Sequence, residues 1–442
     1  MFILISSCAL WAISQAILGR ADSLFKSNFS LRMIFKIFIF CYNTIMNCRL
    51  KILYTNLGDT TIYAYDKPAG RILGWARGNN DVFILAPQLD LEIIKKEILD
   101  KEKSKVQAIF LPFTKKETSS NFGIIISYLI RILISPFILV KRLPVFDFAF
   151  SNSPFLVDII PILWLKIFGK CKHWVLMMDS VVPPPKERSG NSIVNILTYV
   201  ESLLVGRIAN IFADKVFTVN PELKKEMINR GIKESKIILT QNGLIVKNIL
   251  AVKKPKNIEY EAVYMGRISI NKGVLDLIKI WKKLVKKMPK AKLAIMGMGL
   301  DDVVIKFKRE IEKNGLGKNI EYLGFTPSDK KYKVLKNSKV FLYLSKVNAD
   351  ESWGISLMEA LACGLPAISY NLPIYEYIYK TEGLIRIKCN DIDSVTEKLV
   401  YLLENQKVRL ALSQKCINFA KNFDWFKIAE VDLEKIRKSV SL

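Results

Sequence analysis

The sequence predicts an α/β protein built from two doubly wound domains, and three observations predict this class. The chain has 442 residues, 50% hydrophobic and 24% charged, which suffices for two or three domains with their own cores. From residue 47 onward, short apolar runs alternate with helical patterns, as in parallel sheets joined by crossover helices. This series occurs twice, on either side of a basic, proline-containing linker at residues 253–256.

The apolar runs predict the strands in order, and each run is four to six residues long, which suits a buried strand. The first series predicts strands at Lys51–Tyr54, Asp81–Ala86, Val106–Leu111, Phe146–Ser151, His173–Met178, Lys215–Val219 and Ile237–Gln241. The second predicts them at Ala262–Met265, Lys292–Met296, Ile320–Leu323, Val340–Leu344, Pro366–Tyr370 and Leu384–Ile387. We therefore expect Rossmann-like domains over residues 47–250 and 251–421, facing each other across a cleft.

Two helical segments stand apart from this alternation. Residues 422–442 are helical by pattern with no strand after them, so we expect a helix that crosses back onto the first domain. Residues 121–140 form an apolar helix pattern that contains Arg131 as its one charged residue. A buried crossover helix is the favoured interpretation, but an apolar surface nearly all round also fits a helix at a membrane interface.

The first 46 residues form a hydrophobic extension with two open interpretations. Residues 1–19 carry no charge, and positive residues such as Arg20 and Lys26 follow them. If this marginal stretch inserts as an anchor, those charges hold the rest of the chain on the cytoplasmic side. Alternatively, the extension comes from a misassigned start, because a complete first strand begins just after it.

Cysteine and histidine usage excludes several kinds of site. The seven cysteines are scattered without a CxxC pair, and His173 is the single histidine of the chain. A zinc or iron–sulfur site and a Ser-His-Asp or Cys-His centre are therefore not expected, and a reducing compartment fits best. Any catalysis must use carboxylates, Lys, Arg and backbone amides.

The net charge of the chain indicates which classes of binding partner to expect. Lys and Arg number 67 against 41 Asp and Glu, a formal charge of +26. Nucleic acid, an anionic membrane surface or an anionic substrate could each explain the excess. The sequence contains no recognisable nucleic-acid module. We therefore expect an anionic membrane surface as a partner and no nucleic acid.

Two strand ends in the second domain carry candidate phosphate ligands. The strand Ala262–Met265 ends in Gly266 and Arg267, and Lys272 precedes the next helix. Ligands of open α/β sheets bind beyond the carboxyl ends of strands, so these two cations suit a diphosphate. Gly297, after the next strand, either lets the backbone approach a ligand or is a glycine for steric reasons.

A third strand end adds a helix start between two carboxylates. A helix predicted to begin near Gly354 offers unpaired N–H groups for an anion, from Gly354, Ile355, Ser356 and Leu357. Glu351 precedes this helix and Glu359 lies within it. Beside phosphates, carboxylates are sensible as acceptors for sugar and ribose hydroxyls. The plainer interpretations are a helix-start acid for Glu351 and a solvent-exposed residue for Glu359.

This combination resembles the donor-binding signature of GT-B glycosyltransferases, in particular the large retaining family four. The similarity covers roughly residues 47–440 and rests on Gly266-Arg267, Lys272-Gly273 and the pair Glu351 and Glu359 with Ala-Cys-Gly-Leu-Pro after it. The resemblance implies that Arg267 and Lys272 hold the donor diphosphate, Glu359 the ribose and Glu351 the transferred sugar.

Two further positions follow from the resemblance. Gly70, in the loop expected after the first strand, loosely matches a glycine loop near the phosphates. Members often place a histidine after the strand that corresponds to His173–Met178, and here Asp179 takes that place. The site residues are therefore Arg267, Lys272, Glu351 and Asp179 for catalysis. The expected donor contacts are Gly266, Arg267, Lys272, Gly297, Glu351, Gly354, Ile355, Ser356, Leu357, Glu359 and Gly70.

The resemblance implies a metal-independent hexosyltransferase without cofactor. It would move a sugar from a nucleotide-diphosphate sugar to a hydroxyl acceptor, with retention of configuration. We expect a lipid-linked or oligosaccharide acceptor and a location at the cytoplasmic face of the membrane. Two alternatives remain: a nucleotide-sugar 2-epimerase, disfavoured by the scarcity of histidine, and an inactive GT-B membrane scaffold, disfavoured by the intact site residues.

Overall fold

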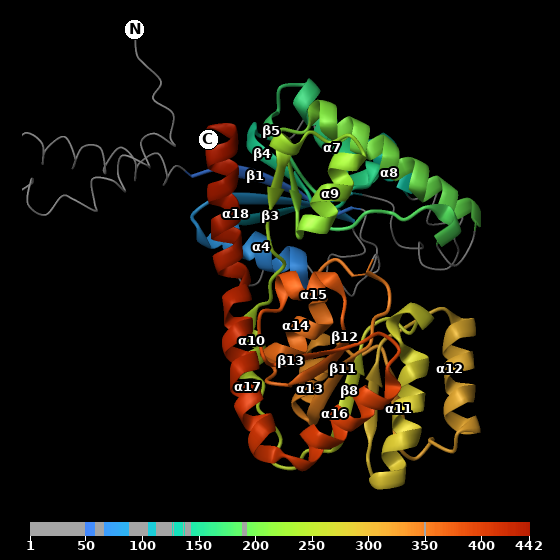
Figure 1. Cartoon of the computed structure of the whole chain (residues 1–442). Coiled ribbons are helices and arrows are strands. Elements are labelled where there is room, and N and C mark those ends of the chain that lie inside the picture. Colours follow the sequence, from blue (N-terminus) through green and yellow to red (C-terminus); the bar gives the residue numbers. More distant parts are fainter. Residues whose placement is uncertain are drawn as a thin grey trace, which may run out of the picture.

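A computed structural model describes residues 49–57, 66–87, 105–111, 126, 128–135, 137, 143–187, 192–348 and 351–442. The hydrophobic extension at residues 1–46 and much of the 121–140 segment lie outside the described residues. The strands form two parallel sheets, one in each half of the chain (Figure 1).

The first sheet has seven strands in the order β3-β2-β1-β4-β5-β6-β7. Their bounds are β1 Lys51–Thr55, β2 Asp81–Pro87, β3 Val106–Leu111, β4 Phe146–Ser151, β5 Cys171–Met177, β6 Lys215–Thr218 and β7 Ile237–Leu239. Helices cover both faces. Ile52 and Tyr54 of β1 pack with α4 (Asp66–Arg77), and Leu53 packs on the opposite face with α7 (Leu156–Ile167) and α8 (Ser192–Phe212). The shorter helix α9 (Pro221–Asn229) follows β6.

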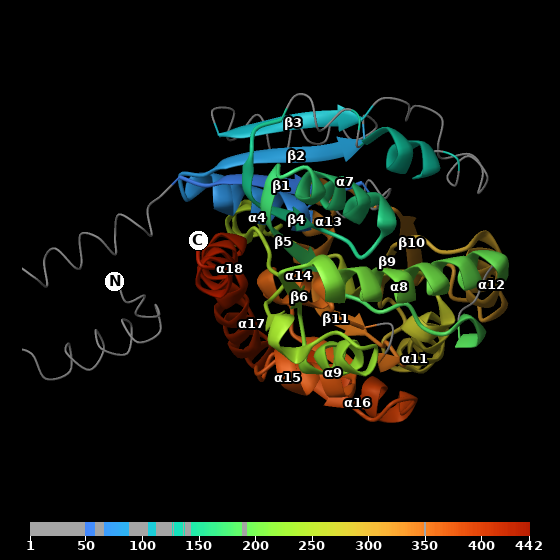
Figure 2. The same cartoon turned by 90° about the horizontal axis from the view of Figure 1, so that it is seen from above.

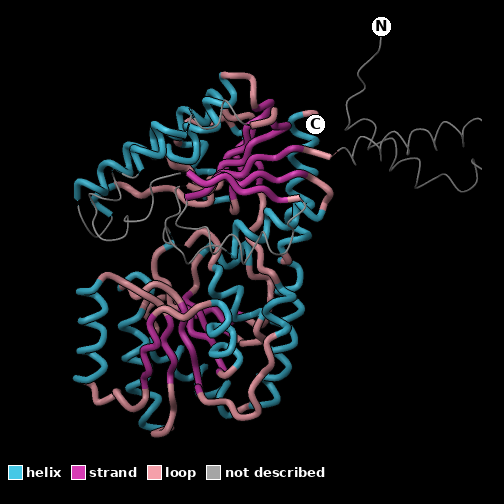
Figure 3. The backbone as a smooth tube through the Cα atoms, turned by 180° about the vertical axis from the view of Figure 1, so that it is seen from behind, coloured by secondary structure: helices cyan, strands magenta, loops and turns pink. Residues whose placement is uncertain are grey.

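The second sheet has six strands in the order β10-β9-β8-β11-β12-β13. Their bounds are β8 Tyr260–Met265, β9 Leu293–Met296, β10 Ile320–Gly324, β11 Ser338–Tyr343, β12 Ala367–Tyr370 and β13 Leu384–Ile387. Helices flank this sheet as well (Figure 3). They are α11 Val274–Lys287, α12 Asp301–Lys313, α13 Ser328–Lys336, α14 Ile355–Ala362, α15 Pro373–Ile378, α16 Ile392–Glu404 and α17 Gln406–Ala420.

The doubly wound prediction is confirmed, because all thirteen predicted strands are present and their ends shift by no more than two residues. Parallel strands that are covered on both faces are apolar throughout, which makes them visible in the sequence. Strand β1 shows the pattern, with Ile52, Leu53 and Tyr54 fully buried.

The last helix returns to the first domain as predicted. Helices α17 and α18 (Trp425–Val440) run in succession along both domains (Figure 1). Helix α18 packs on α4, where the indole N–H of Trp75 donates to the carbonyl of Ala429 at 2.9 Å. Buried Asp432 pairs with Arg71, with 3.2 Å between carboxylate and guanidinium, and accepts from Thr240. One continuous core therefore runs from the first sheet through α18 into the second domain.

The placement of Gly70 in a loop was wrong. Gly70 lies inside helix α4, and a Cβ there would come within 2.1 Å of the Trp425 indole. The close approach of α18 therefore accounts for this glycine, and Arg71 beside it is buried in the pair with Asp432. Sequence spacing placed both residues after β1 but could not show that a helix from the chain end packs there.

Two chain segments that pass between the domains lie next to each other, one after β7 and one before α18. Leu244, after β7, and Asp424, before α18, form a parallel bridge. The amide of Leu244 donates to Phe423 at 2.8 Å, and the amide of Trp425 donates to Leu244 at 3.0 Å. Beyond this point the short helix α10 (Val246–Ala251) is tied to the second domain, because Lys336 Nζ lies 2.5 Å from the carbonyl of Val252.

Candidate functional site

The second sheet changes direction at β8, and the predicted ligands gather there. Strand β9 lies on one side of β8 and β11 on the other, so the loops after β8 and β11 leave in opposite directions. Open α/β sheets bind ligands at such a switch point. Lys272 lies in the loop after β8 and Glu351 in the loop after β11.

Lys272 and Glu351 form a buried ion pair at this point. The Nζ of Lys272 contacts Oε1 of Glu351 and lies 3.5 Å from Oγ of Ser345. The side chains are only 9% and 2% exposed. Gly273 fixes the pairing, because its φ of +72° and the carbonyl of Leu344, 2.2 Å from an added Cβ, exclude any larger residue. The two loops are therefore clamped together at the pair.

The hydroxyl of Tyr343, the last residue of β11, donates to the Glu351 carboxylate. Tyr343 Oη lies 3.0 Å from both oxygens of Glu351. Burial raises the pKa of Tyr343 well above its ordinary value, and the nearby Glu351 charge raises it further. Tyr375 and Tyr379 have pKa values raised by the same two causes, in the same order. These phenols therefore stay protonated; Tyr343 donates to Glu351, and Tyr379 donates to the carbonyls of Trp353 and Gly354 beside it.

Helix α14 begins beside Glu351 with its N-terminus toward the same point. Its N-cap, Gly354, has φ +76°, and a Cβ there would lie 3.7 Å from Oε2 of Glu351. The first intrahelical bond runs from Met358 to Gly354, which leaves the N–H groups of Ile355, Ser356 and Leu357 in the opening turn. Such groups, with the helix dipole, favour an anion. The predicted helix start is confirmed.

Glu359 is buried rather than solvent-exposed, which rejects the plainer interpretation of this residue. It is 4% exposed. Its Oε1 accepts from Tyr332 at 2.9 Å and lies 2.7 Å from Nζ of Lys331, both on α13. A carboxylate has about four acceptor sites, so Glu359 retains capacity for ligand hydroxyls. Glu351 is likewise more than a helix-start acid, since Lys272 and Tyr343 both bind it.

A steric contact explains why the residue after β9, Gly297, is a glycine. A Cβ on Gly297, whose φ is +145°, would lie 1.8 Å from the carbonyl oxygen of Gly266. The loops after β8 and β9 therefore touch through their backbones, and Ile268 continues the contact as a bridge to Gly299. Direct contact of Gly266 or Gly297 with a donor stays a prediction. Arg267 lies in the loop after β8, between Gly266 and Lys272, and is solvent-exposed.

The first domain meets the site through the carboxyl end of β6. Asn220 follows β6, and its side-chain amide donates to the carbonyl of Ser352 at 2.8 Å. The same side chain caps α9 by accepting from Leu223 at 2.8 Å. Asp179 follows β5, is half-buried, and therefore lies on the same edge of the first sheet.

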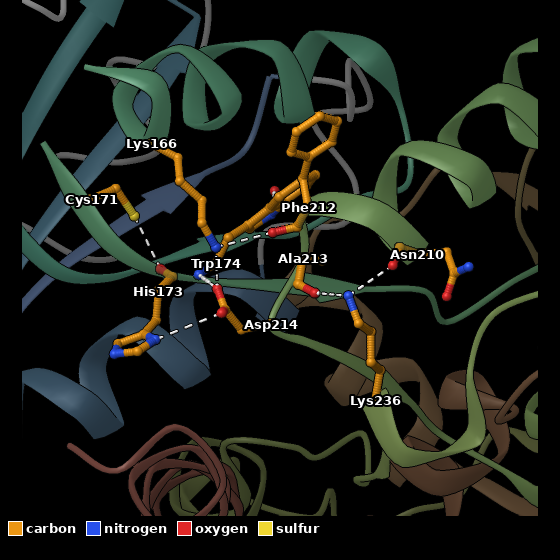
Figure 4. A network of polar contacts seen from close by, with 10 residues as sticks. Lys166, Cys171, His173, Trp174, Asn210, Phe212, Ala213, Asp214 and Lys236 are labelled. Carbon is orange, nitrogen blue, oxygen red and sulfur yellow. Dashed lines mark hydrogen bonds and ion pairs between the residues drawn. The ribbon is translucent and has the colours of Figure 1, made fainter. Parts of the chain in front are cut away.

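His173 belongs to a different network, toward the other end of β5 from Asp179 (Figure 4). Its Nδ1 lies 3.8 Å from Asp214, and Asp214 also pairs with Lys166 at 2.5 Å and accepts from the Trp174 amide at 2.8 Å. Partial burial acts to raise the pKa of Asp214, but the hydrogen bonds from Lys166 and Trp174 outweigh it and lower the pKa. This network fastens α7 to the sheet.

Sequence reasoning missed four polar residues of the site. Tyr343 lies in an apolar strand and was counted as a hydrophobic residue. Lys331 and Tyr332 lie in a lysine-rich helix whose pattern indicates a solvated face. Asn220 has the ordinary signal of a helix cap. Nothing local in the sequence indicates that the first three bind Glu351 and Glu359.

The described residues include no group of three His, Cys, Asp or Glu side chains arranged to hold a metal ion. The pair Asp391 and Asp393 has structural roles. Asp391 caps α16 by accepting from Ser394 at 3.0 Å, and Asp393 pairs with Lys283.

Comparison with known proteins identifies the second domain. Residues 246–423 match the model of the family described as "Glycosyl transferases group 1". A poly(glycerol-phosphate) alpha-glucosyltransferase from Bacillus subtilis is 27% identical over 37% of this chain and 24% of its own length. An alpha-monoglucosyldiacylglycerol synthase from Acholeplasma laidlawii is 26% identical over 36% of this chain and 38% of its own length. The chain thus spans well under two thirds of these relatives.

A solved structure shares the whole architecture. The Anabaena protein HepE, solved in complex with UDP and glucose, matches with a TM-score of 0.66. The match covers 88% of this chain and 99% of that one at 15% identity, which shows the fold. This chain therefore has the two-domain GT-B fold, and residues 246–423 of its second domain are similar to the glycosyl transferases group 1 family.

Proposed function

We propose that this protein is a metal-independent glycosyltransferase that moves a hexosyl unit from a nucleotide-diphosphate sugar to a hydroxyl acceptor. The observation that carries the proposal is the buried Lys272–Glu351 pair beside the N-terminus of α14. A cation, a carboxylate and opening-turn amides at one switch point offer a place for a diphosphate next to a place for a sugar. HepE, with the same fold, was solved with UDP and glucose.

The reaction requires stabilisation of negative charge on the departing diphosphate. Lys272 and the α14 N-terminus would supply fixed positive charge and dipole, which is the most effective form of such stabilisation, and the exposed Arg267 would add a second cation. The Lys272 ammonium has three N–H donors, so it can bind Glu351 and a phosphate oxygen together.

The carboxylates would recognise neutral hydroxyls. Glu351, oriented by Tyr343, would accept from hydroxyls of the transferred sugar, and Glu359 would accept from the ribose. Asp179, on the first domain, would contact the sugar from the opposite side. Retention of configuration, with the leaving phosphate helping to deprotonate the acceptor, belongs to the same proposal by resemblance to family four.

For the acceptor we favour a lipid-linked sugar or glycan at the cytoplasmic face of the membrane. The charge of +26 supports it, as does the diacylglycerol in the name of the Acholeplasma relative. A screen of nucleotide sugars for donor hydrolysis and transfer tests the proposal, with product anomers assigned by NMR. Hydrolysis or transfer of one donor supports it. Interconversion of a free nucleotide sugar would indicate the epimerase, and no reaction with any donor would favour the scaffold.

A further inference from the structure

Helix α8 exposes its apolar side to solvent. Ile193 and Ile211, near its two ends, are both 68% exposed, and Leu197 is 57% exposed. From Ile193 to Leu204 exposed apolar residues recur with the spacing of one helix face, and Ile211 follows two turns later. They are Ile193, Ile196, Leu197, Val200, Leu203, Leu204 and Ile211, with Phe212 at the end. This spacing places them on one face. We call these eight residues the α8 stripe.

The inward side of α8 has the opposite character. The buried residues are Asn195, Ser202, Val205, Gly206 and Ala209, which are small or polar. A surface helix of a soluble domain normally turns its large apolar residues toward the sheet. Here the order is reversed. A long row of exposed aliphatic side chains is a sign of an interaction surface.

Neighbouring helices continue the stripe. Glu201 of α8 points inward, where it accepts from Tyr128 and from the amide of Leu156 at 2.8 Å, so the helical residues 128–135 and α7 both lie against α8. The same helical segment exposes Leu129, Leu133 and Phe137, four residues apart, with Phe137 80% exposed. The end of α7 adds Trp164 and Ile167. Arg131 faces the domain and donates to Leu57 at 2.9 Å.

Composition and charge favour a lipid surface over a protein partner. Protein interfaces favour Tyr, Trp, Arg and Met at their centres within a polar rim. The α8 stripe is almost wholly Ile, Leu and Val. Its helix carries two charged residues, Glu201, which is directed inward, and Arg207, which is exposed. An aliphatic face with a cation, on a chain of charge +26, complements an anionic lipid surface.

Length and composition agree with this assignment without requiring a span. Among the described helices, α8 is the one long and apolar enough to cross a membrane, with 28% of its most apolar window buried. At about 1.5 Å per residue it is about 30 Å long. Because Asn195 and Ser202 are buried and Glu201 binds Tyr128 and Leu156, the helix is held against the domain and presents one side to solvent. Figure 2 shows α8 running along the outside of the first domain.

We propose that the α8 stripe, together with Leu129, Leu133, Phe137, Trp164 and Ile167, lies on an anionic lipid bilayer and binds it as an interfacial surface. Asp179 and the start of α8 are close in sequence. Docking through α8 would therefore place the edge of the first sheet where Asp179 lies, which we expect to face the acceptor, at the lipid headgroups. This inference deepens the proposed function and rests on it for the lipid acceptor.

Depth-dependent fluorescence quenching in the full chain tests the proposal. An environment-sensitive fluorescent amino acid is placed at Leu197 in one sample and at Leu410 in another. Both leucines are 57% exposed on helices, so Leu410 on α17 is a matched control. Vesicles contain phosphatidylcholine with about 30% phosphatidylglycerol and a nitroxide on the upper acyl chain. Because each probe reports its own position, binding through another part of the chain does not produce the signal.

We expect quenching at position 197 at least about threefold stronger than at position 410, decreasing with salt. Equal quenching at both positions, or none at either, would overturn the proposal. So would self-association without vesicles that shields position 197, because a second copy would then cover the stripe. Donor hydrolysis is measured in the same samples. Hydrolysis without quenching contradicts this inference alone, and quenching without hydrolysis of any donor contradicts the proposed function alone.

Discussion

Both domains bury paired charges, Arg71 with Asp432 among them, but the two regions proposed for function depart from ordinary burial in different ways. The second domain buries charge, with Lys272, Glu351 and Glu359 all less than a tenth exposed. The first domain exposes apolar surface along α8. Burying a charge is costly unless it is paired, and exposing a row of aliphatic side chains also lowers stability. Departures of this kind concentrate at functional sites, so the contrast indicates a donor site in one domain and a contact surface in the other.

The largest expected effect is at the diphosphate ligands. Arg267→Ala or Lys272→Ala should each lower donor turnover at least about 100-fold, the scale for loss of one oxyanion donor. Lys279→Ala is the matched control, because Lys279 is an exposed lysine of α11 that pairs with Asp276. Near-normal turnover of the first two variants in an assay of released nucleotide would contradict the donor assignment.

A smaller effect is expected where a phenol orients Glu351. Tyr343→Phe removes a hydroxyl 3.0 Å from both carboxylate oxygens, and we expect kcat to fall about tenfold with little change in KM. Tyr260→Phe is the control, since Tyr260 donates to Glu321 at 2.7 Å at the opposite end of the neighbouring strand. Equal kinetic constants of the two variants would show that Tyr343 does not orient Glu351 for the reaction.

Glu359→Gln is expected to act mainly on donor binding. The substitution keeps the shape but weakens the acceptor for ribose hydroxyls, so KM for the donor should rise several-fold to about tenfold with kcat nearly unchanged. Steady-state kinetics over a range of donor concentrations measure both constants. A fall in kcat at unchanged KM would place Glu359 in the chemical step instead.

These predictions also show what the sequence could and could not provide. The strands, the helix start at Gly354 and the candidate residues Lys272 and Glu351 are local signals, because buried strands are apolar runs and ligands follow strand ends, whereas the ion pair between the two residues is a tertiary contact. Tyr343, Lys331 and Tyr332 bind the carboxylates through tertiary contacts, so spacing alone could not identify them. Gly70 was misplaced for the same reason: its neighbour Trp425 is distant in sequence. The α8 stripe was missed because an apolar helical pattern does not reveal which side faces the sheet.

The smallest expected effect concerns the network around His173, which lies away from the candidate donor site. The pKa of Asp214 is lowered in the folded protein relative to its ordinary value near 3.8. Its stabilising effect is therefore present above that value and lost as pH falls through the lower, folded-state pKa. Asp214→Asn should reduce the free energy of unfolding modestly at about pH 6 and reduce its loss toward about pH 3. Urea unfolding at several pH values measures this, and parallel curves for the two proteins would be the contrary result.

The central claim is that the second domain binds a nucleoside diphosphate at Lys272 and the start of α14. Calorimetric titration of the full chain with UDP, GDP and ADP, with and without a chelator, tests it most directly. We expect one site per chain for at least one of these nucleotides, unaffected by the chelator and weakened at least about tenfold by Lys272→Ala. Absence of binding for all three nucleotides, or unchanged affinity in the Lys272→Ala variant, would contradict it.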